Sequence, residues 1–433
     1  MRDIFARHLR RDDGDDLTIR KCRAGKLRTA PGYRFLADYR LRVEDAGGTT
    51  ATDLQVTVLS YLGERTHQVW ERLRVAQPAA FNDRSLPVAP YAYVPELDML
   101  VQVYPHDHRL VGLAPLLAGC PPVLLRPLLA ALGPGEWRLE RWRAEMVKYR
   151  PVRRATLRLS IEASTAEGEA RAERQFYAKL YPDAAEADRA HGMQQMLHQQ
   201  LEREGSSFVV AEPVAYVPDL QTVVQTAVPG VSLHGLVASG GDAGEALRLA
   251  ALAVARLHGL GLDQGRLEGY ESPRSLHNRI ARLERDAAQL SAACPDLGET
   301  IAAIVARIAS GLGEVALGPT HGDLKPEHIL LDGERVAIID VDFLREADPV
   351  LDVLSMARHL AKAQAAAPMA LDAAAEYVFT EAYLAQSPPE RRARLPLYRA
   401  MDDISDAAAL LASEEPEAQA GARGFVRRAQ SVI

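Results

Sequence analysis

Acidic residues flank a short apolar hairpin within residues 319–352. The β-prone runs in residues 329–339 are separated by an Asp-Gly pair, which is a strong signal for a tight hairpin. An antiparallel hairpin brings the start of its first strand beside the end of its second, so we expect Asp323 near Asp340 and Asp342. Crowded carboxylates repel each other unless a cation or hydrogen bonds compensate. The spacing therefore predicts a site for a divalent metal and a phosphate.

Three blocks of this region occur in the order and near the spacing of a known family. The segment His-Gly-Asp-Leu-Lys-Pro-Glu-His, residues 321–328, resembles the catalytic loop of the aminoglycoside phosphotransferase and choline kinase family. Ile339-Asp340 and the Asp-Pro-x-x-Asp block of residues 348–352 follow, as in that family. The resemblance implies an α+β fold of the bilobal protein-kinase type, with a β-rich small lobe and a mainly helical large lobe.

The resemblance also implies roles for individual side chains. Asp323 would be the catalytic base, which takes or orients the proton of an acceptor hydroxyl. Lys325 would neutralise the phosphoryl group during transfer. Asp340 would bind the Mg²⁺ that bridges the nucleotide phosphates, with Asp342 as a second metal acid or a support. Asp352 would cap the catalytic loop from the following helix. A surface loop that is simply rich in acids is the alternative for the whole group.

His328 departs from the family pattern, which usually has Asn at this position. Imidazole is a softer ligand than an amide oxygen and suits zinc, manganese or iron better than magnesium. Three outcomes are open: His328 binds a less usual metal, magnesium is held by Asp340 and Asp342, or catalysis has been lost. Retention of Asp323, Lys179 and Asp340 favours activity.

Lys179 lies in an apolar run, residues 176–181, that is predicted to be a strand. A lysine buried there without a partner is costly, so we expect its ammonium to face an anion; an edge-strand lysine that reaches water is the alternative. The resemblance implies that it holds the α- and β-phosphates of the nucleotide. Its acidic partner is left open, with Glu186 as a candidate. Gln225 and Ala227 lie where the chain resembles the hinge whose backbone binds the adenine edge.

The most basic stretch of the chain, around Arg153 and Arg154, stands where kinase-like folds have a glycine-rich loop. No glycine is present there to lay backbone amides on phosphates. Either arginine could hold phosphate oxygens instead. A solvated, salt-bridged β-ribbon is the alternative.

An internal repeat relates the first third of the chain to the next segment. Residues 88–102 match residues 211–225, with Tyr, Pro, Leu and Gln in register, and further upstream Ser60 falls opposite Lys179. The repeat predicts that the N-terminal domain is a degenerate copy of the small lobe that serves as a scaffold, dimerisation surface or lid. Two unrelated β-meanders with similar turns are the alternative.

The repeat and a Gly-Pro-Gly linker within residues 131–136 define the expected domains. Residues 1–135 form the extra N-terminal β-rich domain, and residues 136–230 form the nucleotide-binding small lobe. Residues 231–433 form the helical large lobe with the catalytic hairpin. Apolar stripes such as Leu247, Ala250, Val254 and Leu257 predict its helices.

The composition of the chain limits which functional classes and compartments are plausible. The 433 residues are 48% hydrophobic and 25% charged, and the net charge is −7 with a pI near 6.0. These values argue against a general nucleic-acid binder. The cysteines (Cys22, Cys120 and Cys294) are odd in number and widely spaced, which fits a reducing compartment. Neither a signal peptide nor a membrane-spanning run is evident, so we expect a cytoplasmic protein; its oligomeric state is not indicated.

These observations predict an ATP-dependent phosphotransferase that uses Mg²⁺, or another divalent metal because of His328. The acceptor would be a hydroxyl of a small polar molecule: an aminoglycoside, amino sugar, sugar or aminoalcohol. The alternative is a degenerate kinase-fold protein that binds nucleotide or regulates a partner without transfer. Protein phosphorylation is a third hypothesis, disfavoured because Gly322 replaces the arginine usual in protein kinases.

Overall fold

The computed structural model describes residues 1–10, 18–28, 32–44, 51–81, 83–165, 170–240, 243–267, 276–313, 315–366, 374–413 and 417–433. Contacts divide this part of the chain into two units. The first comprises residues 1–189 and 213–227, and the second comprises residues 190–212 and 228–433. Each unit has its own sheets and its own apolar core.

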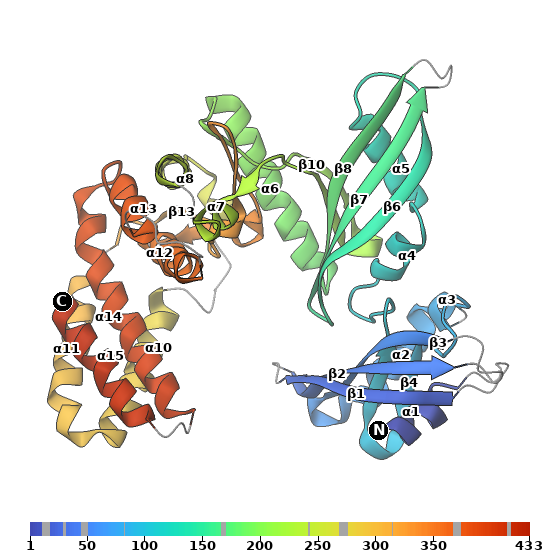
Figure 1. The fold of residues 1–433 in the computed structure, drawn as a ribbon, viewed down its shortest axis with the longest axis horizontal. Coiled ribbons are helices and arrows are strands. Elements are labelled where there is room, and N and C mark those ends of the chain that lie inside the picture. Colours follow the sequence, from blue (N-terminus) through green and yellow to red (C-terminus); the bar gives the residue numbers. More distant parts are fainter. Residues whose placement is uncertain are drawn as a thin grey trace. The chain divides into compact units, whose positions relative to one another are not determined.

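The first unit begins with an antiparallel five-stranded sheet of strand order β1-β2-β3-β5-β4 (blue in Figure 1). The strands are β1 (Thr18–Arg28), β2 (Tyr33–Glu44), β3 (Ala51–Tyr61), β4 (Tyr91–Val94) and β5 (Met99–Val103), with helices α1 (Arg2–His8), α2 (Arg65–Ala76) and α3 (Pro78–Phe81). Phe5 of α1 packs on one face, and Leu73 of α2 packs with Leu59 and Leu100 in a separate cluster. Alternating side chains therefore give this sheet two buried faces.

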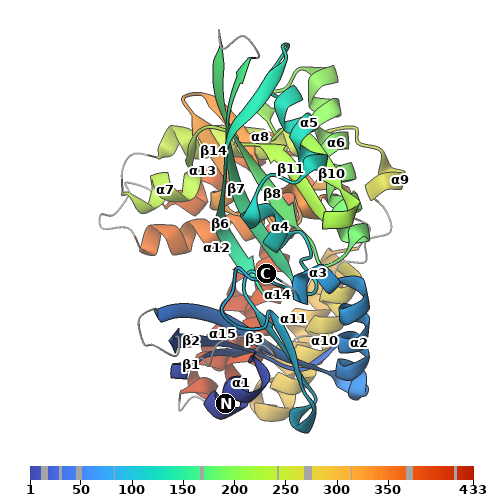
Figure 2. The same ribbon diagram turned by 90° about the vertical axis from the view of Figure 1, so that its right-hand side faces the viewer.

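A second antiparallel five-stranded sheet, of order β6-β7-β8-β11-β10, completes the first unit. Its strands are β6 (Trp137–Arg150), β7 (Arg154–Thr165), β8 (Arg171–Leu180), β10 (Pro213–Val217) and β11 (Thr222–Thr226). Helix α6 (Ala184–Glu204) follows β8, and its residues from Ala190 onward belong to the second unit. Helices α4 (Leu113–Ala118) and α5 (Pro122–Ala130) lie along this sheet in both views (Figures 1 and 2). The predicted β-rich composition of this part of the chain is confirmed.

The two sheets have the same strand order and the same connections. In each, three strands form a meander, a helix follows, and a hairpin returns to the third strand. The hairpins even share their turn: 3-10 helices Pro95–Leu97 and Pro218–Leu220 are followed by the left-handed residues Asp98 (φ 44°) and Gln221 (φ 49°). This correspondence supports the repeat predicted from the sequence.

The strand pairing corrects one position in the predicted alignment of the repeat. Lys179 pairs with Val223 in the second sheet, and Leu59 pairs with Leu100 in the first. Because Leu100 and Val223 occupy the same place in the two hairpins, the counterpart of Lys179 is Leu59 and not Ser60. A shift of one residue turns a side chain to the opposite face of a strand. The Ser60 side chain therefore lies on the face opposite to the one that corresponds to Lys179.

Helices α4 and α5 pack with the second sheet. Leu113, Leu116 and Leu128 lie in one buried cluster with Leu157 and Leu159 of β7. These two helices, which precede the predicted boundary at residue 135, therefore share a core with the second sheet.

The second unit contains the predicted hairpin at the centre of a four-stranded sheet of order β12-β14-β15-β9. The strands are β9 (Phe208–Val209), β12 (Val231–Ser232), β14 (Ile329–Asp332) and β15 (Arg335–Ile338); β13 (Gly318–Thr320) and β16 (Arg345–Ala347) pair separately. Asp332 pairs with Arg335, so the turn consists of Gly333 (φ 60°) and Glu334, one residue later than the sequence indicated.

Helices form the rest of the second unit, in addition to most of α6. They are α7 (Leu233–Ala238), α8 (Gly244–Leu257), α9 (Gln264–Leu267), α10 (Leu276–Ala293), α11 (Gly298–Gly311), α12 (Val350–Ala365), α13 (Ala375–Leu384), α14 (Pro389–Leu411) and α15 (Ala418–Val432). The predicted stripe of α8 is buried. Helices α10, α11, α14 and α15 pack together as a bundle (Figure 1). Among the described residues, no helix has both the length and the apolar character that crossing a bilayer requires.

Candidate active site

Asp352, near the start of α12, holds the loop that contains Asp323. Its carboxylate accepts hydrogen bonds from the backbone amides of His321 (2.6 Å) and Gly322 (3.0 Å). His258 donates to it through Nε2 at 3.1 Å, and Nδ1 of His258 accepts from the hydroxyl of Tyr383 at 2.8 Å. Burial opposes ionisation of Asp352, but its hydrogen bonds with His258 and His321 hold its pKa below the ordinary value. Asp352 therefore has the expected capping role.

Gly322 is required by the backbone of this loop. Its φ is +81°, and an added Cβ would lie 2.5 Å from the carbonyl oxygen of Phe343. A side chain of any size would collide with that backbone, and L-residues seldom adopt this φ. The arginine that protein kinases have at this position could not be accommodated here.

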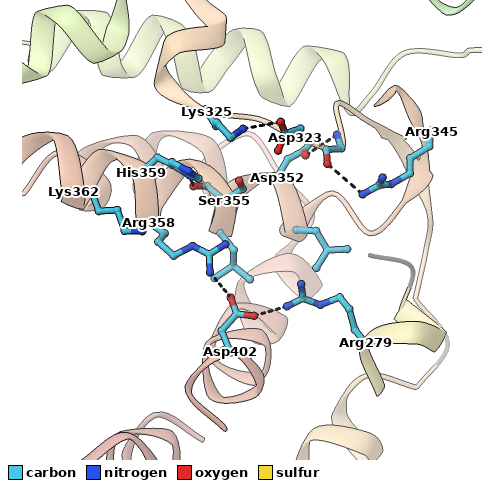
Figure 3. A pocket seen from close by; sticks show the side chains of 13 residues that line it. Arg279, Asp323, Lys325, Arg345, Asp352, Ser355, Arg358, His359, Lys362 and Asp402 are labelled. Carbon is cyan, nitrogen blue, oxygen red and sulfur yellow. Dashed lines mark hydrogen bonds and ion pairs between the residues drawn. The ribbon is translucent and has the colours of Figure 1, made fainter. Parts of the chain in front are cut away.

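Asp323 and Lys325 lie together at the wall of a pocket of about 310 Å³ (Figure 3). Nζ of Lys325 donates to Oδ2 of Asp323 at 2.6 Å, and the Asp323 side chain is 18% exposed. A partly exposed carboxylate at a pocket wall is able to reach the proton of a bound hydroxyl. The adjacent ammonium is able to offset negative charge that develops beside it.

Asp340 and His328 form a second close pair, at the ends of the hairpin of β14 and β15. Nε2 of His328 lies 3.4 Å from Oδ2 of Asp340, and the His328 ring stacks on that of His321 with centroids 5.3 Å apart. Burial, and then the neighbouring His321, lower the pKa of His328 to about 4, so its imidazole is neutral at neutral pH. Its buried Nδ1 has no hydrogen-bond partner among the residues that the structure describes.

A neutral imidazole beside a carboxylate can contribute two ligands to a divalent cation. Asp342, also buried, follows Asp340 by two residues. Within the described ranges, no three metal-ligating side chains are grouped as a complete protein site. A cation held by this pair would therefore need further ligands from a bound molecule or from water.

The far wall of the pocket is basic and was not foreseen from the sequence. Ser355, Arg358, His359 and Lys362 project from one side of α12. Arg279 of α10 and Asp402 of α14 lie below them in Figure 3. Arg279 donates to Asp402 at 2.6 Å, and Arg358 lies 3.7 Å from the same carboxylate. The spacing of Arg358 and Lys362, one helical turn apart, is the signal that a sequence reading could have used.

The remaining candidate residues lie in the first unit. Lys179 is on β8, between β7 and β11, and its side chain is buried. Arg154 donates to Glu186 at 2.7 Å and stacks over the ring of Tyr181. Glu186 thus has an arginine partner. Arg153, next in the turn, is exposed and has no side-chain partner in the described part of the chain.

The turn that carries Arg153 is anchored to Asp107, a residue that the sequence did not single out. This buried carboxylate accepts from the hydroxyl of Tyr149 at 2.9 Å and from the amide of Val152 at 2.8 Å. Val152 has φ +57°, an uncommon conformation for a β-branched residue, and it packs in the cluster that contains Leu59. The turn therefore takes its shape from the N-terminal domain.

Gln225 and Ala227, the residues expected at the hinge, lie at the second sheet. Gln225 is buried on β11, opposite Tyr177. The backbone N–H of Ala227 donates to the carbonyl of Gln175 at 3.0 Å. That amide is already used within the lobe, so it is not available to the edge of an adenine in this conformation.

Comparison with known proteins identifies one family. The sequence model of the phosphotransferase enzyme family (APH) matches residues 165–395, which is more than half of the chain. Among curated proteins, none matches the chain significantly.

Solved structures that match this chain share little sequence identity with it. One is macrolide 2'-phosphotransferase MphH from Brachybacterium faecium, with 20% identity, 70% of this chain and 97% of that chain covered, and a TM-score of 0.41. Another is a choline/ethanolamine kinase family protein from Mesorhizobium loti, with 17% identity, 67% and 87% covered, and a TM-score of 0.39. A third is ethanolamine kinase from Plasmodium vivax, with 10% identity, 67% and 84% covered, and a TM-score of 0.39.

Proposed function

We propose, from the premise that this chain belongs to the phosphotransferase enzyme family, that it transfers the γ-phosphoryl group of ATP to a hydroxyl of a small polar molecule. The observation that carries the proposal is Asp323 at the wall of a pocket, on a loop fixed by Asp352 and paired with Lys325. A mobile carboxylate would serve poorly as a base, because catalysis depends on its distance and orientation.

In the proposed reaction, Asp323 accepts the proton of the acceptor hydroxyl. A bond forms between that oxygen and the γ-phosphorus, the bond to the β-phosphate oxygen breaks, and ADP leaves. Lys325 stabilises the charge on the transferred group. Arg153 is the turn arginine assigned to the phosphates, because Arg154 is committed to Glu186. Lys179 is assigned to the α- and β-phosphates.

Asp340, with His328 and Asp342, would hold the divalent cation. When bound, this cation neutralises the phosphates and orients them for transfer. Because His328 is neutral near pH 7, its nitrogen is available as a ligand. We therefore expect Mn²⁺ to support turnover at least as well as Mg²⁺, and His328→Asn to shift the preference toward Mg²⁺. Equal metal preference in the two proteins, measured by ADP release, would argue that His328 is not a ligand.

The decisive test of the proposal is Asp323→Asn. We expect turnover to fall by roughly 100- to 10,000-fold, because the base is removed while the loop keeps its shape. ATP binding, measured by calorimetry, should be preserved. Asp332→Asn, at the exposed end of the same hairpin, is a matched control that should keep full turnover. Unchanged turnover in Asp323→Asn would reject the assignment.

A protein that binds nucleotide without transferring phosphate is the second candidate. His328 in place of the usual Asn and a turn without glycine favour it. Tight binding of ATP with Mg²⁺ or Mn²⁺, together with no ADP release across a broad panel of acceptors, would support this candidate over the first. In either case we propose that the N-terminal domain acts as a scaffold for the small-lobe turn, through Asp107 and Val152.

A further inference from the structure

The pocket beside Asp323 has more positive than negative groups at its wall. Five cationic side chains line it, against three carboxylates. A pocket built for a cationic acceptor would show the opposite balance, with carboxylates free to meet an ammonium group.

All three carboxylates are already engaged. Asp323 pairs with Lys325 at 2.6 Å, and Asp352 accepts from the two loop amides and His258. Asp402 accepts from Arg279 at 2.6 Å and lies 3.7 Å from Arg358. An acceptor ammonium would have to displace one of these partners in order to be paired.

Three of the cationic side chains, in contrast, still have hydrogen-bond donors that could bind an anion. Lys362 forms no ion pair with any residue that the structure describes. Nε of Arg279 is buried without a hydrogen-bond partner in the described ranges. The ion pair that Arg358 forms with Asp402 is long, at 3.7 Å, and Asp406 lies near enough to feel the charge of Arg358. Arg358 and Lys362 are also four residues apart on α12, where like charges repel each other unless an anion lies between them.

A hydroxyl-binding group completes this wall. Nδ1 of His359 donates to the backbone carbonyl of Ser355 at 2.7 Å. In the neutral imidazole this leaves Nε2 as an acceptor, which is suited to a hydroxyl of the bound molecule.

We propose that the acceptor is an anionic polyhydroxylated molecule, whose carboxylate or phosphate ester binds Arg358 and Lys362 while one of its hydroxyls faces Asp323. This inference rests on the proposed function, because it takes the pocket as the acceptor site. It narrows the acceptor classes expected from the sequence: aminoglycosides, amino sugars and aminoalcohols are cationic and would be disfavoured, as would neutral sugars.

Molecules that share a carbon skeleton and differ in charge provide the test. Gluconate, glucose 6-phosphate, glucose and glucosamine would be titrated into the full chain by calorimetry without nucleotide, and assayed in parallel by ADP release. We expect at least one of the two anions to bind, glucose to bind weakly and glucosamine not to bind. The two anions distinguish a carboxylate site from a phosphate site.

Variants connect the binding to the two cations. Lys362→Gln and Arg358→Gln should each weaken anion binding by roughly ten- to a hundred-fold, the range expected for a lost charged hydrogen bond. Arg399→Gln, at an exposed position of α14 outside the pocket, makes the same charge change and should bind the anion as the unmodified chain does.

The outcomes separate this inference from the proposed function. Anion binding that depends on Lys362 and Arg358, without ADP release, would support the anionic site and reject phosphoryl transfer to these molecules. The inference is overturned if glucosamine binds more tightly than gluconate and glucose 6-phosphate, if neither anion binds, or if both variants bind as tightly as Arg399→Gln.

Discussion

The two five-stranded sheets have one strand order but differ at a single decisive position. Where the second sheet has Lys179 on its third strand, the first has Leu59, which is fully buried. The Leu59 cluster also contains Val152, the residue at the tip of the turn between β6 and β7. Val152 of the second sheet therefore packs in the same buried cluster as Leu59 of the first sheet.

Lys179→Leu would make the second sheet resemble the first and is expected to have the largest effect. Turnover should fall by roughly 100- to 1,000-fold, the loss typical when a group that stabilises phosphate charge is removed. The midpoint of thermal unfolding should change little, since Leu59 shows that an apolar residue suits this place in the sheet. ADP release and thermal unfolding measure the two effects.

A matched control is Leu59→Met, which keeps volume and polarity and should cost less than about 1.5 kcal/mol without loss of turnover. Full activity in Lys179→Leu would mean that the two sheets do not differ in function at this position.

Asp107→Asn would loosen the contact between the two sheets. An amide cannot accept the hydrogen bonds that the carboxylate receives from both Tyr149 and Val152 while also serving the amides of Arg109 and Leu110. We expect the free energy of unfolding to fall by about 1–3 kcal/mol, as for buried donors left unpaired. Urea unfolding measures this change.

The nucleotide KM should rise in Asp107→Asn as well, because the turn that holds Arg153 loses its anchor. Asp219→Asn, on the exposed turn of the second sheet, should be close to neutral in both measurements. An unchanged KM in Asp107→Asn would show that the turn keeps its position without the hydrogen bonds to Asp107.

The buried His108 is expected to make the stability of the folded chain depend on pH. Burial lowers the pKa of His108 from 6.5 to about 4, although Asp107 acts in the opposite direction. The imidazole bonds to Gln102, the counterpart of Gln225, at 2.8 Å and to Tyr61 at 2.7 Å. Between pH 6.5 and 4 the unfolded chain binds a proton that the folded chain does not, so stability falls as the pH falls through this window.

At pH 5 this loss is roughly 2 kcal/mol relative to pH 7.5, since each pH unit below 6.5 contributes about 1.4 kcal/mol. His108→Gln should remove that part of the dependence. Urea unfolding at the two pH values tests it, and a slope equal to that of the unmodified chain would show that His108 is not the titrating group.

Local sequence signals predicted the elements that depend on near neighbours. The hairpin of β14 and β15 followed from two apolar runs and a glycine turn, and the repeat was visible because both hairpins use the same proline-led turn. The capping role of Asp352 was implied by the family resemblance, and its hydrogen bonds to the amides of His321 and Gly322 agree with it. The α+β class was implied by the same resemblance, and both the class and the family are confirmed.

What the sequence could not predict depends on distant partners. Ser60 was aligned with Lys179 because sequence matching does not show strand register, which the pairing of Leu59 with Leu100 reveals. The basic wall of the pocket is built from α10, α12 and α14, whose contributing residues are far apart in the chain. Asp107 precedes its partner Val152 by 45 positions, so no local pattern connects them.

The packing of α4 and α5 determines where this chain can be shortened. The glycines of residues 131–136 look like a natural place to begin a smaller protein. A chain that began there would lose two helices from the sheet that carries Lys179 and would expose Leu157 and Leu159 to water. A chain that began just before Tyr104 would keep those helices and Asp107. Val152 would then lose its contacts with the Leu59 cluster, so this apolar residue would be the one to replace with a polar residue.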